Sequence, residues 1–216
     1  NPDVDSLKQE ERGNHKGPIK IPAIVLTGGR GHVILPVLHR WPCFRSKHNH
    51  PTIHLSLSHA SASYMAKDVE IEGYRIRYSI WDTAGQEQYH SLVPMYFRQS
   101  AAVILVYDIT KKASFVEAKE WLEEIRRNAP GDVIIALTGN KCDLETQREV
   151  DSKDAEEFAA EINAFHSETS AKTAVGISEL FDCLGRKFIE KKDIPGSAGI
   201  QLAGGQGGHS SGCRCG

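Results

Sequence analysis

Hydrophobic positions beyond Tyr64 follow two different periods along the chain. Every second residue of Tyr74–Ile80 is Tyr or Ile, which is typical of a strand with one buried face. The run Ala101–Tyr107 is apolar throughout, which is typical of a strand buried on both faces of a parallel sheet. Two later segments repeat apolar residues every three or four positions and predict amphipathic helices, with apolar faces made of Phe115, Ala118, Trp121, Leu122 and Ile125, and of Ile177, Leu180, Phe181, Leu184 and Phe188.

Shorter segments complete an alternation of strands and helices. Ala23–Thr27 is an apolar run stopped by glycines, and Val69 and Ile71 form the first arm of a hairpin that turns near Gly73. A strand, a helix and a short strand are predicted at Val133–Leu137, Ser152–Ala160 and Ala164–His166. The alternation predicts an α/β domain with a mostly parallel sheet, covered by helices on both faces and open to a ligand at the carboxyl ends of its strands.

Three stretches lack such a pattern. Residues 1–19 are polar, and we interpret them as a disordered leader. Residues 193–216 are rich in Gly and Ser and predict a flexible tail. Between them the predicted domain spans residues 20–192, with an aberrant part at residues 28–60 that has neither a helical nor a strand period.

Composition narrows the class of protein. The chain has 216 residues and a net charge of -2, which predicts one domain without a global excess of positive charge for nucleic acid. Its five cysteines are odd in number and include no C-x-x-C pair, which argues against a disulfide scaffold or a zinc module and favours a reducing cytosol. No apolar run is long enough to cross a bilayer, so we expect any membrane contact to come from an attached group.

Polar residues with the chemistry of a phosphate site follow the strand that ends near Trp81. Asp82 can hold a hydrated magnesium ion, Gly85 lets a backbone N–H approach a terminal phosphate, and the amide of Gln86 can orient a water. By itself, this segment is equally typical of a turn that ends a strand.

A second polar segment, Asn140–Asp143, follows the apolar strand predicted at Val133–Leu137 and so lies at a carboxyl end of the sheet. The carboxylate of Asp143 can accept two N–H donors from the edge of guanine, while Asn140 and the stem of Lys141 can support the ring. Ser170–Lys172 follows a short strand and can supply a backbone N–H to the guanine oxygen. Each segment alone is also typical of a solvated loop, but the three together, in this order, are a strong signal.

In this order, the segments resemble a small GTPase of the Ras superfamily and, within it, the Rab family. The motifs that carry the resemblance are Trp81–Glu87, Ser91–Phe97 and Tyr107–Thr110, while Pro94–Tyr96 and Gly139–Leu144 are similar to the early-endosomal branch of Rabs. The match covers about residues 61–191. It implies a P-loop NTPase-like small GTPase fold, with a six-stranded, mostly parallel sheet flanked by helices.

The resemblance implies a role for each matching residue. Gln86 would be the catalytic residue that positions the attacking water, and Asp82 would hold the cofactor Mg²⁺ through water. Gly28 and Gly85 would contact the phosphates of GTP or GDP. The residues that would bind guanine are Asn140, Lys141, Asp143, Ser170, Ala171 and Lys172.

Two further groups of residues match the family. Tyr64, Trp81 and Tyr96 occupy the places of three aromatics that report the nucleotide state to effectors, with Tyr64 replacing the usual Phe; half-buried aromatics at a core edge are the alternative. Cys213 and Cys215 resemble the Rab prenylation site, where two lipid chains anchor the protein firmly; a metal or redox pair is the alternative.

The family also implies partners and a location. The ligand would be a guanine nucleotide, and the protein partners would be effectors, an exchange factor, an activating protein, a prenylation escort and a GDP-dissociation inhibitor. Membrane contact would come through prenyl groups, and no nucleic acid is implied. The function would be GTP hydrolysis coupled to vesicle traffic and endocytosis at the cytoplasmic face of endosomal or other vesicle membranes, with cycling through the cytosol.

The chain departs from the family pattern between residues 28 and 60. A phosphate-binding loop reads Gly-x-x-x-x-Gly-Lys-Ser/Thr, but Val33, Ile34 and Leu35 stand where Gly, Lys and Ser or Thr are expected. Pro36 then falls inside the expected first helix, which it would break. Thr52 would be the magnesium ligand of switch I only if residues 54–60 loop out. We therefore expect the first helix and switch I to be irregular.

Because this mismatch is confined between stretches that fit, it favours a shifted reading frame with retained intron sequence over gradual drift. Three functional hypotheses follow. The chain is a nucleotide-dependent switch, or a pseudo-GTPase that acts as a lipid-anchored interaction module, or a non-functional product that folds poorly.

Overall fold

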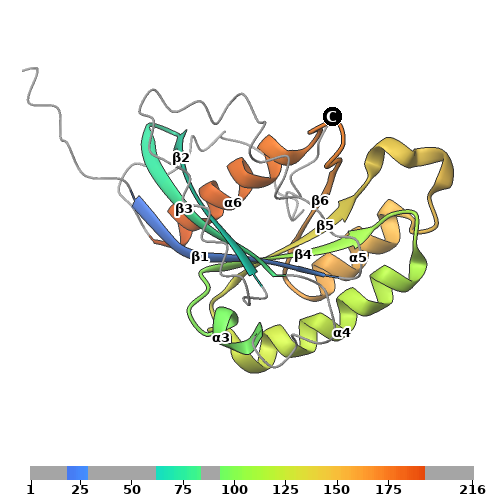
Figure 1. Ribbon diagram of the computed structural model, residues 1–216, viewed down its shortest axis with the longest axis horizontal. Coiled ribbons are helices and arrows are strands. Elements are labelled where there is room, and N and C mark those ends of the chain that lie inside the picture. Colours follow the sequence, from blue (N-terminus) through green and yellow to red (C-terminus); the bar gives the residue numbers. More distant parts are fainter. Residues whose placement is uncertain (1–18, 29–61, 84–92, 193–216) are drawn as a thin grey trace, which may run out of the picture.

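The computed structural model describes residues 19–28, 62–83 and 93–192 of the chain (Figure 1). Within these residues, six strands form one sheet in the order β2-β3-β1-β4-β5-β6. The strands are β1 (Ile19–Gly28), β2 (Ala62–Ile71), β3 (Tyr74–Thr83), β4 (Ala102–Asp108), β5 (Ile134–Asn140) and β6 (Phe165–Thr169). The sheet therefore contains the predicted number of strands.

The sheet is mostly parallel. The strand β1 lies at its centre and pairs in parallel with both β3 and β4, and β4, β5 and β6 continue the parallel arrangement. Of the described strands, only β2 runs antiparallel, because it forms a hairpin with β3 whose turn is made by Glu72 and Gly73, both at positive φ. The predicted α/β fold with a mostly parallel six-stranded sheet is thus confirmed.

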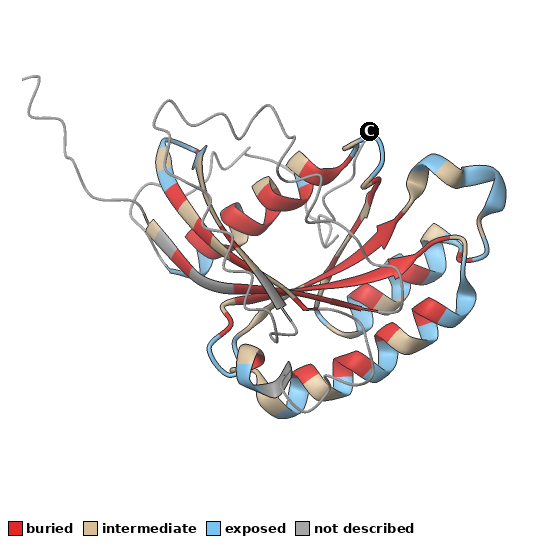
Figure 2. Ribbon diagram, viewed as in Figure 1, coloured by how far each residue is buried: buried red, intermediate tan, exposed pale blue. Residues whose placement is uncertain are grey.

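Helices cover both faces of the sheet, as Figure 1 shows. They are α3 (Val93–Phe97), α4 (Lys112–Asn128), α5 (Ser152–Glu161) and α6 (Ile177–Lys191). The first three pack on one face, whereas α6 packs alone on the other face among the described residues. Their buried positions form stripes that face the sheet (Figure 2).

The described residues form two hydrophobic cores, one on each face of the sheet. Along β4, Ile104 and Val106 enter the core beneath α6, while Leu105 and Tyr107 enter the core beneath α4 and α5. All seven residues of β4 are buried, which explains why this strand is apolar throughout. On β3, in contrast, only Ile76, Tyr78 and Ile80 are core residues, in agreement with the alternating pattern.

Element boundaries differ from the predictions where polar residues interrupt the pattern. The strand β1 begins at Ile19, the last residue of the stretch interpreted as a leader. The strand β5 continues past Leu137 to Asn140, which we expected in the following loop. Neither the short helix α3 nor the 3-10 helix Cys142–Gln147 was predicted. The expected irregularity of the first helix and of switch I lies outside the described residues.

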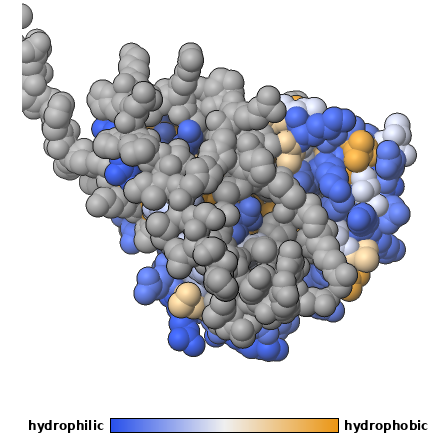
Figure 3. All heavy atoms as spheres, in the orientation of Figure 1, coloured by the Kyte–Doolittle hydropathy of each residue, from blue (hydrophilic) through white to orange (hydrophobic). Residues whose placement is uncertain are grey.

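The surface of the described part is predominantly hydrophilic where Figure 3 shows it. The exposed large hydrophobic residues among the described positions are Met95, Val116 and Val175. No helix of the described residues is long and apolar enough to span a membrane.

The helix α6 is fixed to the hairpin by a buried hydroxyl. Tyr78 donates a hydrogen bond to the carbonyl oxygen of Phe181 over 2.7 Å, and the two rings pack with centroids 5.5 Å apart. Burial raises the pKa of the Tyr78 hydroxyl, which therefore stays protonated and can donate. Gly185 allows this close approach, since a Cβ there would lie 2.5 Å from the Tyr78 hydroxyl oxygen.

Replacing Tyr78 by Phe removes this donor without changing the shape of the core. We expect Tyr78→Phe to lower the free energy of unfolding by about 1–2 kcal/mol, measured by denaturant titration. The matched control is Tyr64→Phe, whose half-buried hydroxyl lies 3.5 Å from the Ser79 hydroxyl and should contribute little. Equal losses in the two variants would contradict the role given to Tyr78.

Candidate functional site

The candidate site lies where three parallel strands end. The last residues of β4, β5 and β6 stand opposite one another, because Asp108 pairs in register with Asn140 and Asn140 with Thr169. The polar segments that follow these strands are therefore brought to one edge of the sheet. Open parallel sheets bind their ligands at this edge.

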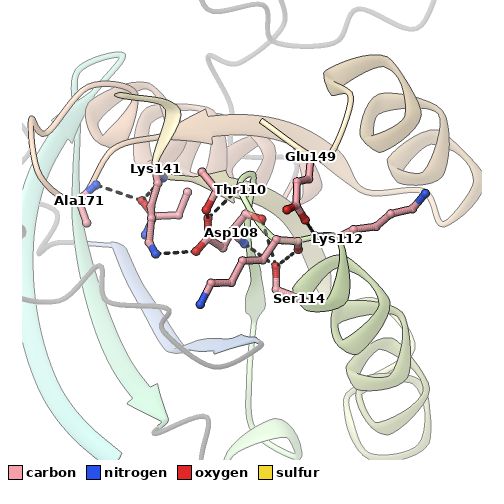
Figure 4. Close-up of polar contacts among 9 residues, drawn as sticks. Asp108, Thr110, Lys112, Ser114, Lys141, Glu149 and Ala171 are labelled. Carbon is pink, nitrogen blue, oxygen red and sulfur yellow. Dashed lines mark hydrogen bonds and ion pairs between the residues drawn. The ribbon is translucent and has the colours of Figure 1, made fainter. Parts of the chain in front are cut away.

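Asn140 connects two of the three segments. Its side chain is buried, and its Oδ1 atom accepts hydrogen bonds from the backbone N–H of Lys141 at 2.8 Å and of Ala171 at 3.0 Å. Figure 4 shows the bond to Ala171 reaching across from the end of β5 to the loop after β6. Asn140 thereby holds the two predicted base-binding segments side by side.

A second link joins Asp143 to Ser170. The Ser170 hydroxyl donates to Oδ1 of Asp143 over 2.6 Å and accepts from the backbone N–H groups of Lys172 and Thr173. Ser170 is buried, whereas Asp143 is exposed. The buried hydroxyl of Ser170 consequently holds the exposed carboxylate of Asp143 in place.

Lys141 stands between these two links. Its backbone is in the left-handed region, at φ 68°, which is uncommon for a residue with a side chain. Its ammonium group lies 2.5 Å from Oδ2 of Asp108, at the end of β4. Burial alone would raise the pKa of the Asp108 carboxyl, but hydrogen bonds from Lys141 and Thr110 outweigh burial and hold this pKa below its ordinary value.

The rim of the site is supported by charged groups. Arg148 donates to both carboxylate oxygens of Glu168, at 2.7 and 2.8 Å, and also to Glu145. These hydrogen bonds raise the pKa of Arg148, so the guanidinium stays charged. Gly176, at φ 73°, closes the loop after β6, because a Cβ there would lie 2.0 Å from the carbonyl oxygen of Glu168.

Two residues that are predicted to lie near the phosphates are on neighbouring central strands. Gly28 ends β1, and a Cβ at this position would lie 2.0 Å from the carbonyl oxygen of Val106, so only glycine fits. Asp82 lies near the end of β3, opposite Leu26 of β1. The sheet thus carries Gly28 and Asp82 to the same edge as the predicted base-binding segments. Gly85 and Gln86 lie outside the described residues.

The described residues supply few ligands for magnesium. Among them, no group of three or more His, Cys, Asp or Glu side chains could hold a metal ion. Asp82 provides one carboxylate, whereas Thr52 lies outside the described residues, and Leu35 replaces the expected loop hydroxyl. These residues by themselves do not form a magnesium site, which normally needs six oxygen ligands from side chains, phosphates and water.

The three predicted aromatics form one continuous cluster. Trp81 packs against Tyr64, with ring centroids 4.8 Å apart, and against Tyr96, with centroids 5.3 Å apart. All three side chains are half-buried, and Met95 beside Tyr96 is 60% exposed. The cluster joins the hairpin to α3 and offers partly exposed aromatic surface. Cys213 and Cys215 lie outside the described residues.

Sequence reasoning missed two supporting groups, Asp108 and the Arg148–Glu168 pair. Asp108 lies in the motif Tyr107–Thr110, which resembles the Rab family but has no predicted role of its own. Its signal was an acid directly after an apolar strand, the same signal that singled out Asp82. No comparable signal marks the pair Arg148–Glu168, since the two residues are twenty positions apart along the chain.

Comparison with known proteins identifies the family. The sequence model of the Ras family matches residues 44–190 of the chain. The chain belongs to the Ras family. It is 47% identical over 143 residues to Ras-related protein Rab-31 of Rattus norvegicus, a match that covers 65% of this chain and 73% of the relative. It is 44% identical over 146 residues to Ras-related protein Rab-22A of Homo sapiens, covering 68% of this chain and 72% of the relative.

These relatives confirm the predicted Rab-family small GTPase. The family match begins at residue 44. It thus leaves out β1 and the position of the phosphate-binding loop in the family pattern. Nevertheless, β1 takes the centre of the sheet, between β3 and β4. The Rab-family fold of this chain therefore depends on a strand that the family match does not include.

Removing the Asn140 side chain should loosen the contact between the two predicted base-binding segments. We expect Asn140→Ala to lower the free energy of unfolding by about 2–3 kcal/mol, because two backbone N–H groups lose their acceptor. The amide proton of Ala171 should also exchange faster with solvent, as measured by NMR. The matched control is Asn128→Ala at the end of α4, which should leave the Ala171 exchange rate unchanged. Unchanged exchange in both variants would contradict the role of Asn140.

Proposed function

We propose that this Rab-family protein binds guanine nucleotides at the joined ends of β4, β5 and β6 and acts as a nucleotide-dependent regulator of vesicle traffic. The observation that carries the proposal is the pair of links Asn140–Ala171 and Asp143–Ser170, which assemble the base-binding segments. A site assembled before the ligand arrives loses less conformational entropy on binding.

Each described residue has a chemical role in this proposal. The carboxylate of Asp143 accepts the two N–H donors on the guanine edge, and the stem of Lys141 lies against the ring face. Asn140 supports the ring's other polar edge. The Ala171 N–H, which donates to Asn140 in this structure, would be shared with the guanine oxygen. Ser170 keeps Asp143 in position, and Lys172 continues the same loop.

The contacts with the phosphates would be weaker than the contacts with the guanine base. Gly28, Asp82 and Gly85 would face the phosphates, and Gln86 would orient the water that attacks GTP. The loop lacks the Lys and the hydroxyl of the family pattern. A charge-assisted contact contributes roughly 1.5–3 kcal/mol, so we expect nucleotide affinity to fall on the order of a hundredfold to ten-thousandfold relative to a complete loop.

The proposed function includes hydrolysis of the bound GTP. In this class of enzyme, intrinsic GTP hydrolysis is slow until an activating protein supplies an arginine to the transition state. Mg²⁺ supplies charge neutralisation of the phosphates when it is bound. The residues of this chain that would serve the reaction are Gln86, which positions the water, and Asp82, which faces the metal through water.

Membership of the family supports the partners and the location that we propose. The aromatic cluster of Tyr64, Trp81 and Tyr96 would bind effectors, and the exchange factor, activating protein, prenylation escort and GDP-dissociation inhibitor would be those of a Rab. Prenyl groups on Cys213 and Cys215 would attach the protein to the cytoplasmic face of endosomal or other vesicle membranes, between periods in the cytosol.

One observation favours a second candidate function. Because Val33, Ile34 and Leu35 replace the phosphate-binding residues, the chain could serve as a lipid-anchored interaction module that does not switch. In that case the aromatic cluster would bind its partners regardless of nucleotide.

Titration of the full chain with fluorescent GDP and Mg²⁺ tests the first proposal. We expect GDP to bind, and guanosine to compete within about tenfold of GDP, because the loop contributes few phosphate contacts. The triple substitution Val33→Gly, Ile34→Lys and Leu35→Ser should restore a preference for GDP over guanosine. Adenosine serves as the control ligand and should not compete.

The other outcomes separate the remaining hypotheses. Absence of GDP and guanosine binding together with a cooperative thermal transition would support the interaction module. Absence of any cooperative transition would support a non-functional product.

The role of the aromatic cluster can be tested by removing one ring at its edge. We expect Tyr96→Ala to lose proteins that the wild-type chain captures from cytosol, because the ring offers half-buried aromatic surface beside the exposed Met95. The control is Tyr74→Ala, at the turn of the hairpin, which should capture the same proteins as the wild type. Mass spectrometry of the captured proteins gives the readout, and identical sets for all three chains would contradict the effector role.

A further inference from the structure

Asp108 carries more interactions than the end of a strand requires. Its Oδ1 atom accepts from the backbone N–H of Thr110 at 2.9 Å and from the Thr110 hydroxyl at 2.7 Å. Its Oδ2 atom accepts from the Lys141 ammonium at 2.5 Å. Figure 4 shows these contacts converging on the Asp108 carboxylate, between β4 and the segment that follows β5. One carboxylate oxygen thus accepts hydrogen bonds within the local turn, and the other accepts a hydrogen bond from Lys141.

The position of Asp108 is itself fixed. Its backbone N–H donates to the Ser114 hydroxyl at 2.9 Å, and the following residue, Ile109, donates to the carbonyl of Asn140 at 3.1 Å. The side chain of Asp108 is only 5% exposed, whereas that of Lys141 is 35% exposed. A buried carboxylate therefore holds the end of a side chain whose stem lies partly at the surface.

Such an arrangement restricts Lys141, a residue that would otherwise be mobile. A free lysine side chain samples many rotamers and loses that freedom when it packs against a ligand. Here the backbone of Lys141 is held at positive φ and its ammonium is held by Asp108, so both ends of the stem are fixed. The stem is consequently ordered before any ligand binds.

We propose that Asp108 is a positioning residue of the base site, which fixes Lys141 through the ion pair so that the lysine stem presents an ordered surface to the guanine ring. This inference rests on the proposed function, because it assigns the role of Asp108 toward the same ligand. Asp108 acts through Lys141 and does not touch the nucleotide. Thr110 has a different part, since it satisfies the carboxylate oxygen that does not face Lys141.

A double-mutant cycle tests the proposal in the full chain. Affinity for fluorescent GDP is measured for the wild type, Asp108→Asn, Lys141→Met and the combination of both. We expect Asp108→Asn to weaken binding roughly tenfold, and to have no further effect once Lys141 is Met, because Asp108 acts only through Lys141. Equal effects of Asp108→Asn with and without Lys141 would overturn the proposal.

Controls separate positioning from general stability. Asp68→Asn removes another ion-paired carboxylate, which binds Arg75 and Arg77 on the hairpin, and should leave GDP affinity unchanged. Thermal midpoints are recorded for every variant. If Asp108→Asn and an equally destabilised Asp68→Asn lose the same GDP affinity, the loss reflects stability alone. That result would overturn the proposal.

A second measurement needs neither nucleotide binding nor a folded variant of Asp108. In the wild-type chain, the ammonium protons of Lys141 should exchange slowly enough to be seen by nitrogen-edited NMR, with the signal assigned by its loss in Lys141→Met. Absence of the signal in the wild type would overturn the inference.

The two proposals can therefore fail separately. If neither GDP nor guanosine binds the wild-type chain, the proposed function fails, and the NMR signal alone decides whether Asp108 fixes Lys141. Loss of that signal in a folded Asp108→Asn variant supports the fixed lysine, and persistence of the signal overturns it.

Discussion

The register between β4, β5 and β6 is the constraint on which the candidate site depends. Hydrogen bonding between these parallel strands aligns Asp108, Asn140 and Thr169 in one row. Neighbouring strands lie about 4.8 Å apart, so a side chain in this row reaches the segment that follows the next strand. Asp108 thus reaches Lys141, and Asn140 reaches Ala171. A register shifted by one residue would turn these side chains to opposite faces and separate the partners.

The centre of the sheet links this site to the rest of the fold. The strand β1 contributes Ile24 and Leu26 to the core beneath α6 and Val25 to the core beneath α3, α4 and α5. Its last residue, Gly28, approaches Val106 so closely that a side chain would not fit. A strand outside the family match therefore contributes to both hydrophobic cores and carries Gly28, a predicted phosphate contact, to the same edge as the predicted base-binding segments.

Most elements of the fold could be predicted from the sequence, because hydrophobic periods are local. The hairpin at Gly73, the apolar strand β4 and the helices α4 and α6 follow directly from such periods. The helix α3 is only five residues long, which is too short to show a period. The strand β5 extends beyond its apolar run, because its backbone pairing continues through Asn140 although the side chain is polar. In each case the prediction ended where the hydrophobic pattern did.

For the site, the sequence by itself determined which polar residues follow which strands, and their order established the resemblance that the family match then confirmed. Only the tertiary structure decided which of these side chains touch. The ion pair of Lys141 with Asp108 spans 33 residues, the bond of Ala171 to Asn140 spans 31, and the bond of Ser170 to Asp143 spans 27. Contacts over such separations are set by strand order and register, which depend on how the whole sheet packs and leave no period in the local sequence.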